Sequence, residues 1–368
     1  MLSKILFYLF IFSVVIQLYF LLSAYIRLIL YKKKETKTTV QPVSIIVCAY
    51  NELENLKKLL PKLYKQNHPA FEIIIVDDKS HDGTYEFLRE ESANNPLLKI
   101  ATITETPDHI NYKKYALLIG IKKAKNDIVL LTDADCLPAS NQWASSMAGA
   151  FEKDTKIVLG YSQYEKRNGF LNAFIRYETI HTGVQYIAAA LAKNPYMGVG
   201  RNLAYKKSFF LEKDGFSGFE GVMGGDDDLF INKYADRKNT EISIGKDALV
   251  YSIPKTTFKE YYHQKLRHLS VGKLYRFGSK FRLGILLFTP LLFWFSFITL
   301  AIVEKEPAWL WWGFAFRLVY LILVYIPSSK KLGDSTNILT LIFMDFFYLL
   351  YQFMIGIPAL FAKKIRWR

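Results

Sequence analysis

Long apolar stretches at both ends restrict this chain of 368 residues more than any other feature. Residues 5–30 are almost all apolar, and they are followed by Lys32, Lys33 and Lys34. About 20 apolar residues suffice to cross the hydrocarbon core of a membrane, and a basic flank favours the cytosolic side. A cleaved signal peptide fits poorly, because the stretch is too long and no small-residue cleavage site follows it. We therefore expect residues 1–31 to form a membrane anchor that leaves the next domain in the cytoplasm.

Further apolar stretches occupy the C-terminal part of the chain, at residues 283–303, 308–326 and 337–362. The link 304–307 is short, so the first two stretches should form a hairpin. The last stretch contains Asp345 and Pro358, and a crossing there would place the basic tail 363–368 outside, against the positive-inside tendency. We expect residues 283–362 to be membrane segments, the last of them re-entrant or interfacial. Together, the apolar stretches at both ends predict a multi-pass protein of the cell inner membrane.

Residues 255–282 contain eight Lys or Arg residues, a single acid, Glu260, and interleaved aromatic residues. This pattern predicts an amphipathic helix on the membrane surface, although an ordinary solvated basic helix is an alternative. The net charge of +15 is compatible with nucleic acid, anionic lipid or phosphate-bearing ligands. No nucleic-acid recognition motif is visible, so lipid headgroups and diphosphates are the expected partners.

Short β-branched apolar runs alternate with helix-length stretches in the domain 40–254. The expected strands are 43–49, 71–76, 98–103 and 127–132, and the expected helices are 52–66, 84–94 and 113–125. This alternation predicts an α/β fold with a mostly parallel sheet, whose ligands bind beyond the carboxyl ends of the strands. Tyr50, Asp78 and Asp133 should then lie along one edge. A G-x-G-x-x-G turn and a Walker-type loop are both missing from the sequence, so a dinucleotide or P-loop site is a poor fit.

Three acidic groups stand out in this domain, and the first, Asp77-Asp78, is equally explained by a turn that caps the next helix. Asp133 and Asp135 follow a strand, and carboxylates in this arrangement suit Mg²⁺ or Mn²⁺ held together with substrate phosphates. Asp226, Asp227 and Asp228 follow two glycines and open a helix. Simple helix capping would explain one acid, but three acids indicate that one of them removes a proton.

The order of these motifs resembles glycosyltransferase family 2. The resemblance runs from about Ser44 to Gly272. Its motifs are the segment 44–52, Val76-Asp77-Asp78, Lys113 ahead of Ala116-Leu117, Asp133-Ala134-Asp135, the segment 198–205, Asp226-Asp227-Asp228-Leu229 and Gln264-Lys265-Leu266-Arg267. The resemblance implies a Rossmann-like GT-A domain that is flanked by transmembrane helices.

The resemblance also implies an inverting, metal-dependent transferase that takes a sugar from a nucleotide diphosphate, with a UDP-sugar as the favoured donor. The acceptor would be a lipid or a lipid-linked glycan at the cytoplasmic membrane face, as in cell-envelope polysaccharide synthesis. Asp135 would bind the metal, and Asp226 would be the general base with Asp227 as a possible substitute. The implied donor-binding residues are Ala49, Tyr50, Glu52, Asp78, Lys113, Asp133, Gln264 and Arg267.

Two departures from the family pattern bear on the alternatives. His268 stands where processive synthases have Trp after Gln-x-x-Arg, and Gly225 stands where Glu is usual. A processive polysaccharide synthase is therefore the second reading. A haloacid dehalogenase-like phosphohydrolase, suggested by Asp133-Ala134-Asp135, and a non-catalytic membrane scaffold are more remote ones.

Overall fold

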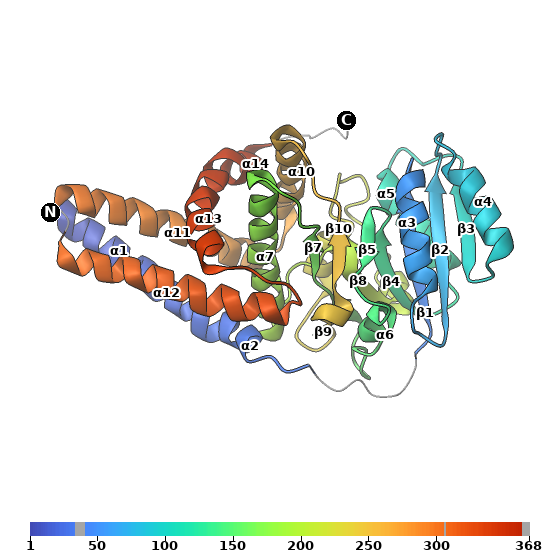
Figure 1. Ribbon diagram of the computed structural model, residues 1–368, viewed down its shortest axis with the longest axis horizontal. Helices are drawn as coiled ribbons and strands as arrows, with labels where there is room; N and C mark the ends of the chain where they lie inside the picture. Colours follow the sequence, from blue (N-terminus) through green and yellow to red (C-terminus); the bar gives the residue numbers. More distant parts are fainter. Residues whose placement is uncertain (34–40, 305–306, 363–368) are drawn as a thin grey trace.

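The computed structural model describes residues 1–33, 41–304 and 307–362. The expected basic tail 363–368 and Lys34 lie outside the described residues. Figure 1 shows the described chain as a sheet domain at one end and a bundle of long helices at the other. Helix α7 (Phe170–Leu191) stands between the two parts.

The central sheet has seven strands in the order β3-β2-β1-β4-β8-β6-β9. Strands β3, β2, β1 and β4 are mutually parallel, β6 and β9 are parallel, and β8 runs antiparallel to β4 and β6. The strands are β1 (Val43–Ala49), β2 (Phe71–Asp78), β3 (Leu98–Ile103), β4 (Ile128–Asp133), β6 (Ile157–Leu159), β8 (Leu203–Lys206) and β9 (Thr240–Ile242). The prediction of a mostly parallel α/β fold is confirmed, and all four expected strands form within a few residues of their expected bounds.

Helices cover both faces of this sheet, which explains why its strands are apolar throughout. On β1, Ile46 packs into the core on one face, while Ile45 and Val47 pack into the core on the other. The helices of this domain are α3 (Leu53–Tyr64), α4 (Thr84–Asn94), α5 (Tyr112–Lys123), α6 (Trp143–Ala148), α8 (Lys207–Glu212) and α9 (Asp228–Tyr234). A second sheet, in the order β5-β10-β7, contains β5 (Cys136–Pro138), β10 (Val250–Ser252) and β7 (Ser162–Tyr164).

Among the described residues, four helices are long and apolar enough to cross a membrane, judged by length and composition. They comprise Leu2–Ile29, Phe277–Val303, Ala308–Lys331 and Ile338–Phe361. The first contains α1 (Leu2–Phe20) and α2 (Ile26–Ile29), the next two are α11 and α12, and the last contains α13 (Ile338–Tyr351) and α14 (Ile357–Phe361). The last segment is thus long enough to cross, and its expected re-entrant or interfacial position stays a prediction.

The basic region 255–282 forms one helix and the start of another. Helix α10 (Phe258–Val271) begins with a capping box between Thr257 and Glu260, and α11 (Phe277–Val303) begins six residues earlier than the expected boundary at 283. Tyr261 and Lys265 of α10 are buried, and Lys265 forms an ion pair with Glu178 of α7. One face of α10 therefore packs on protein. The placement of its other face on a membrane surface stays a prediction.

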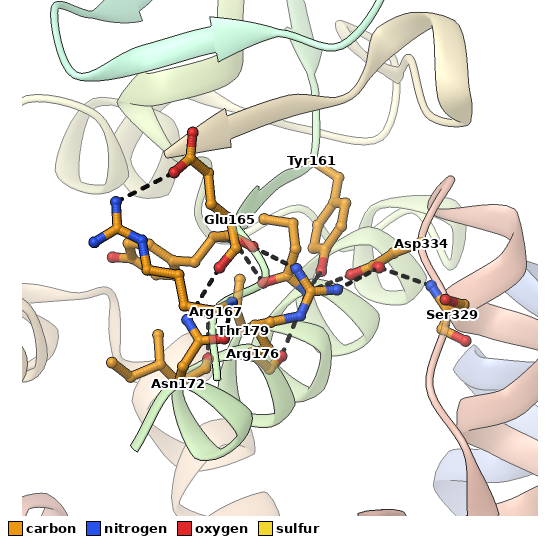
Figure 2. A network of polar contacts seen from close by, with 12 residues as sticks. Tyr161, Glu165, Arg167, Asn172, Arg176, Thr179, Ser329 and Asp334 are labelled. Atoms are coloured by element: carbon orange, nitrogen blue, oxygen red, sulfur yellow. Dashed lines mark hydrogen bonds and ion pairs between the residues drawn. The ribbon is translucent and has the colours of Figure 1, made fainter. Parts of the chain in front are cut away.

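Figure 2 shows the polar network that joins the sheet domain to the loop after α12. Asp334 in this loop forms an ion pair of 2.8 Å with Arg176 of α7 and accepts a hydrogen bond from Gln163 of β7. Arg176 also donates to the carbonyl oxygen of Tyr164, and Gln163 donates to the hydroxyl of Tyr161 at 2.9 Å. Because Asp334 is almost fully buried, these contacts hold α7, β7 and the α12–α13 loop in one arrangement.

A buried ion pair holds the long helices together. Arg317 of α12 and Asp345 of α13 pair through two hydrogen bonds, and their side chains are 4% and 3% exposed. Gln17 of α1 accepts from Arg317 at 2.6 Å, and Trp294 of α11 donates to Asp345 at 3.3 Å. Four helices therefore meet at one satisfied polar cluster, which an apolar environment requires.

The buried pair predicts the stability of two variants. Replacing Asp345 by Leu leaves the Arg317 guanidinium buried without a carboxylate, and should lower the free energy of unfolding by about 3–5 kcal/mol. The double variant R317M/D345L removes both charges and should regain most of that loss. Equilibrium unfolding in detergent measures both, with E54Q, which removes an exposed ion pair to Lys57, as the neutral control. A double variant as unstable as the single one would contradict this account.

Candidate active site

The carboxyl ends of β1, β2 and β4 meet at one edge of the sheet, as the sequence predicts. Ala49 at the end of β1 pairs in register with Asp77 of β2, and Cys48 pairs with Asp133 of β4. Asp78 follows Asp77 as the last residue of β2. Ala49, Asp78 and Asp133 therefore share one rim, where ligands of parallel sheets bind.

Tyr50, Glu52 and Asp78 lie on the part of the rim that β1 and β2 form. Tyr50 is exposed, whereas Glu52 and Asp78 are half-buried. Burial raises the pKa of Asp78 although Lys79 lies 3.4 Å away and lowers it. Burial also raises the pKa of Glu52, and the charge of Asp135 adds to this rise. Glu52 is therefore within electrostatic reach of the predicted metal ligand.

Lys113 joins two acidic groups that are distant in the sequence. It belongs to the first turn of α5, and its Nζ lies 2.9 Å from Asp133 Oδ1 and 3.4 Å from Asp226 Oδ2. Burial alone would lower the pKa of Lys113, but the charges of Asp133 and Asp226 raise it well above its usual range. The ammonium group is thus charged and bridges the two predicted functional carboxylates. A pocket at this point is lined by Lys113, Asp133, Gly200, Asp226 and Asp227.

Asp133, Asp135 and Cys136 bring their possible ligand atoms within 4.8 Å of one another. Burial raises the pKa of Asp135, the charge of Asp133 raises it further, and the charges of Arg201 and Lys113 lower it. Two neighbouring carboxylates of like charge favour a shared cation. Their hard oxygen atoms fit Mg²⁺ or Mn²⁺, whereas the buried Cys136 thiol, whose pKa burial raises, is a poor ligand for such ions.

Asp226, Asp227 and Asp228 point to three different partners. Burial alone would raise the pKa of Asp226, but the charges of Lys113 and Lys114 lower it. Asp227 accepts hydrogen bonds from the backbone N–H groups of Gly200 and Asp228, at 2.6 and 2.7 Å. Burial, followed by the charge of Asp226, raises the pKa of Asp227 to about 6. Asp226 is therefore the most strongly ionised of the three and the one that contacts Lys113.

The contacts of Asp228 connect elements of the fold. It receives a hydrogen bond of 2.6 Å from the hydroxyl of Tyr275, which precedes α11. Burial, followed by the charge of Asp227, raises its pKa well above the usual range. Asp228 thus links the start of α9 to the chain that enters the first C-terminal membrane helix.

A buried lysine holds the loop that precedes Asp226. Lys114 is fully buried, and its ammonium group donates to the carbonyl oxygens of Val222 and Gly224. Gly225 has a φ of +74°, and a Cβ placed on it would lie 2.5 Å from Leu229 Cδ1. A residue with a Cβ would be strained at this φ, and glycine, which stands here where the family pattern has Glu, adopts it without strain.

Helix α10 brings a basic side chain close to the carboxylates. Burial lowers the pKa of Arg267, and the charges of Asp226 and Asp133 act in the opposite direction. Its guanidinium lies 3.3 Å from His268 Nε2. Gln264 is half-buried on the same helix, and the described residues include no hydrogen-bond partner for its side chain. The structure thus brings Arg267 to the site, and the predicted contact of Gln264 with the donor stays a prediction.

Sequence reasoning missed three residues of this site. Lys114 is one of them, because a fully buried lysine has no signature in the sequence. Tyr275 is one of several aromatic residues in the basic region 255–282, and nothing in the sequence distinguishes it from the others. Arg201 lies in the motif 198–205 and received no role, although that motif was a signal that its residues lie near the site.

A Rossmann-like sheet with paired carboxylates and a lysine at its carboxyl edge is the arrangement expected of a GT-A-type domain. Residues 44–212 match the family model described as Glycosyl transferase family 2. This part of the chain is therefore similar to that family.

The chain matches one curated protein over a short stretch and another over almost its whole length. It is 31% identical to the undecaprenyl-phosphate 4-deoxy-4-formamido-L-arabinose transferase of Aeromonas hydrophila, over 27% of this chain and 30% of that protein. It is 23% identical to the probable glycosyltransferase YdaM of Bacillus subtilis, over 91% of this chain and 88% of that protein. The matches to the first three curated relatives span only 26–34% of their lengths.

Among solved structures, the chain is similar to the mannosyltransferase PcManGT of Pyrobaculum calidifontis, whose structure contains GDP-Man and Mn²⁺. The identity is 21%, the TM-score is 0.59, and the match covers 90% of this chain and 98% of that one. At this identity, the similarity supports the fold.

The positive φ of Gly225 predicts a large effect of a small substitution. Gly225→Ala should lower the free energy of unfolding by roughly 1–3 kcal/mol, because a Cβ is strained in this conformation and collides with Leu229. Gly284→Ala in α11 is the matched control, since its Cβ would meet no atom within 4 Å. Unfolding in detergent compares the two. Equal stability of both variants would show that the loop has another conformation.

Proposed function

We propose that this chain is an inverting glycosyltransferase that transfers a sugar from a nucleotide diphosphate to a lipid or lipid-linked glycan. Its catalytic domain would lie in the cytoplasm, at the face of the cell inner membrane. The observation that carries the proposal is the contact of Lys113 with both Asp133 and Asp226. It unites a diphosphate-binding group and a proton acceptor in one pocket.

Asp226 has the properties of a general base in this reaction. Its lowered pKa keeps it ionised, and its side chain lines the pocket beside Lys113. It would take the proton of an acceptor hydroxyl while the oxygen attacks the anomeric carbon of the donor sugar. The bond from that carbon to the diphosphate breaks, and the nucleoside diphosphate leaves with the electron pair. Attack opposite to the leaving group inverts the anomeric centre.

The departing diphosphate carries charge that must be neutralised. Lys113 already lies against Asp133 and is positioned to bind a phosphate oxygen, and Arg267 of α10 approaches the same carboxylates. Asp133 and Asp135 would hold Mg²⁺ or Mn²⁺, which would neutralise further negative charge. Ala49, Tyr50, Glu52 and Asp78 would bind the nucleoside on the neighbouring part of the rim, since they lie at the ends of β1 and β2.

Two observations support a membrane lipid as the source of the acceptor. Asp228, next to the pocket residue Asp227, contacts Tyr275 directly before the apolar helix α11, and α10 carries both Arg267 and exposed aromatic residues such as Phe258. A matched relative is named as an undecaprenyl-phosphate transferase, which indicates an acceptor of this class. We expect a UDP-sugar as donor. GDP-sugars are the necessary comparison, because the similar mannosyltransferase binds GDP-Man.

The proposal predicts metal-dependent release of one nucleoside diphosphate. Detergent-purified protein with Mn²⁺ or Mg²⁺ would be given UDP-, GDP- and dTDP-sugars, with and without membrane lipid extract. Asp226→Ala should lower kcat/KM by roughly 10²–10⁴-fold, because it removes the base, and Asp135→Ala should also abolish the metal dependence. Product length on gels distinguishes single transfer from polymer synthesis.

The matched control is Asp154→Ala, which removes an exposed carboxylate far from the pocket and should leave kcat/KM unchanged. Release that persists in both active-site variants would refute the assignment of the site. No release from any donor by the folded protein, even with lipid extract, would favour a scaffold.

The raised pKa of Asp227 predicts a pH dependence. Ionised Asp227 accepts two backbone N–H groups and strengthens the basicity of Asp226, whereas the protonated form loses an acceptor. The value of kcat/KM should therefore rise with pH through about 6 and level off above it. In Asp227→Asn this step should disappear, since Asn does not titrate, while measurable activity remains. A step near pH 6 that persists in D227N would assign it to another group.

A further inference from the structure

Arg201 is a basic residue at the site, and it has no role in the reaction proposed above. It lies in the turn Gly200–Asn202, directly before β8. The antiparallel pairing of Leu131 with Leu203, continued by two residues, brings Arg201 level with Asp133. The preceding residue, Gly200, donates its N–H to Asp227. Arg201 is therefore carried by a segment that both the sheet and the catalytic carboxylates hold in place.

The guanidinium of Arg201 is positioned by stacking. It lies over the ring of Tyr164, 4.6 Å from the ring centroid. Tyr164 is buried at the end of β7, where Arg176 donates to its carbonyl oxygen, as part of the network around Asp334 (Figure 2). An arginine stacked in this way keeps its face on the ring and leaves its N–H donors at the edges available.

These donors have no carboxylate partner in the described part of the chain. Neither a hydrogen bond nor an ion pair links the Arg201 guanidinium to another described residue, and its side chain remains partly accessible. The negative charges of Asp133 and Asp135 nevertheless act on it, so it lies close to the predicted metal ligands without neutralising them directly. A fixed guanidinium beside such a pair is suited to a phosphate oxygen that the same cation would bind.

The position of Arg201 along the rim shows on which side of Asp133 it lies. The predicted nucleoside residues lie at the ends of β2 and β1, Asp133 ends β4, and β8 is the next strand. Arg201 thus lies on the opposite side of Asp133 from the predicted nucleoside-binding residues. This is the side of Tyr164 and α7, and α7 packs against the helices α12 and α13. A ligand that reaches the carboxylates from the membrane helices would pass Arg201.

We propose that Arg201 binds a phosphate group beside Asp133 and Asp135, on the side that faces the membrane helices. The inference deepens the proposed function and rests on it. The phosphate has two possible sources, the diphosphate of the donor and the phosphate of a lipid acceptor. Both offer the planar guanidinium the same oxygen geometry.

Binding measurements on the full-length protein in detergent separate the two sources. One arm titrates UDP and GDP in the presence of Mn²⁺, and the other titrates a polyprenyl phosphate, with the matching polyprenol as the uncharged comparison. Arg201→Gln should weaken binding in one arm by roughly tenfold to a hundredfold, as expected for loss of a charged hydrogen bond. The arm that changes identifies the source, and Arg201→Lys should lose less.

Arg167→Gln is the matched control, because Arg167 lies in the same region but pairs with Glu165 at an exposed position. It should bind both probes like the wild type. Equal binding of both probes by R201Q and the wild type would overturn the proposal, and so would the absence of binding of either probe to the folded wild type. Binding without sugar transfer would instead refute the proposed reaction and leave the role of Arg201 intact.

Discussion

The site depends on one ammonium group that holds mutually repelling carboxylates together. Asp133 and Asp226 come from distant parts of the chain and lie 2.9 and 3.4 Å from Lys113 Nζ. In a partly buried pocket such charges interact several times more strongly than in water, so the carboxylates could not stay close without a cation. The adjacent Lys114 faces elsewhere and fixes the loop before Asp226 through two backbone carbonyls. The first turn of α5 therefore sets both the charge and the geometry of the pocket.

A second constraint comes from α7, which belongs to neither part of the molecule alone. It contacts β7 and β9 of the sheet domain as well as α12 and α13 of the helix bundle. Arg176 of this helix pairs with Asp334 between α12 and α13, and Glu178 pairs with Lys265 of α10. The helix that carries Arg267 and the strand that carries Tyr164 are thus both fastened to α7. Through α7, the membrane helices therefore help to fix the positions of the side chains around the pocket.

The sequence was informative wherever local patterns determine structure. The first four parallel strands and the helices between them follow from apolar periodicity, so the positions of Ala49, Asp78 and Asp133 on one rim were predictable. The approach of Asp226 to Lys113 depends on the loop 222–225, whose course is set by Lys114 and by positive φ angles, and neither leaves a local signature. The stacking of Arg201 on Tyr164 requires the second sheet, whose strands are only three residues long. Short strands carry too little periodicity to be recognised.

The conformation of Gly225 also bears on how this chain can change by mutation. A glutamate at this position would need a negative φ and the space that Leu229 now occupies. Two adjustments would have to occur together, one in the backbone of the loop and one in the side chain of α9, and either alone would be disfavoured. The effect of a substitution at 225 thus depends on the residue at 229. Substitutions at 225 and 229 should therefore have non-additive effects on the free energy of unfolding.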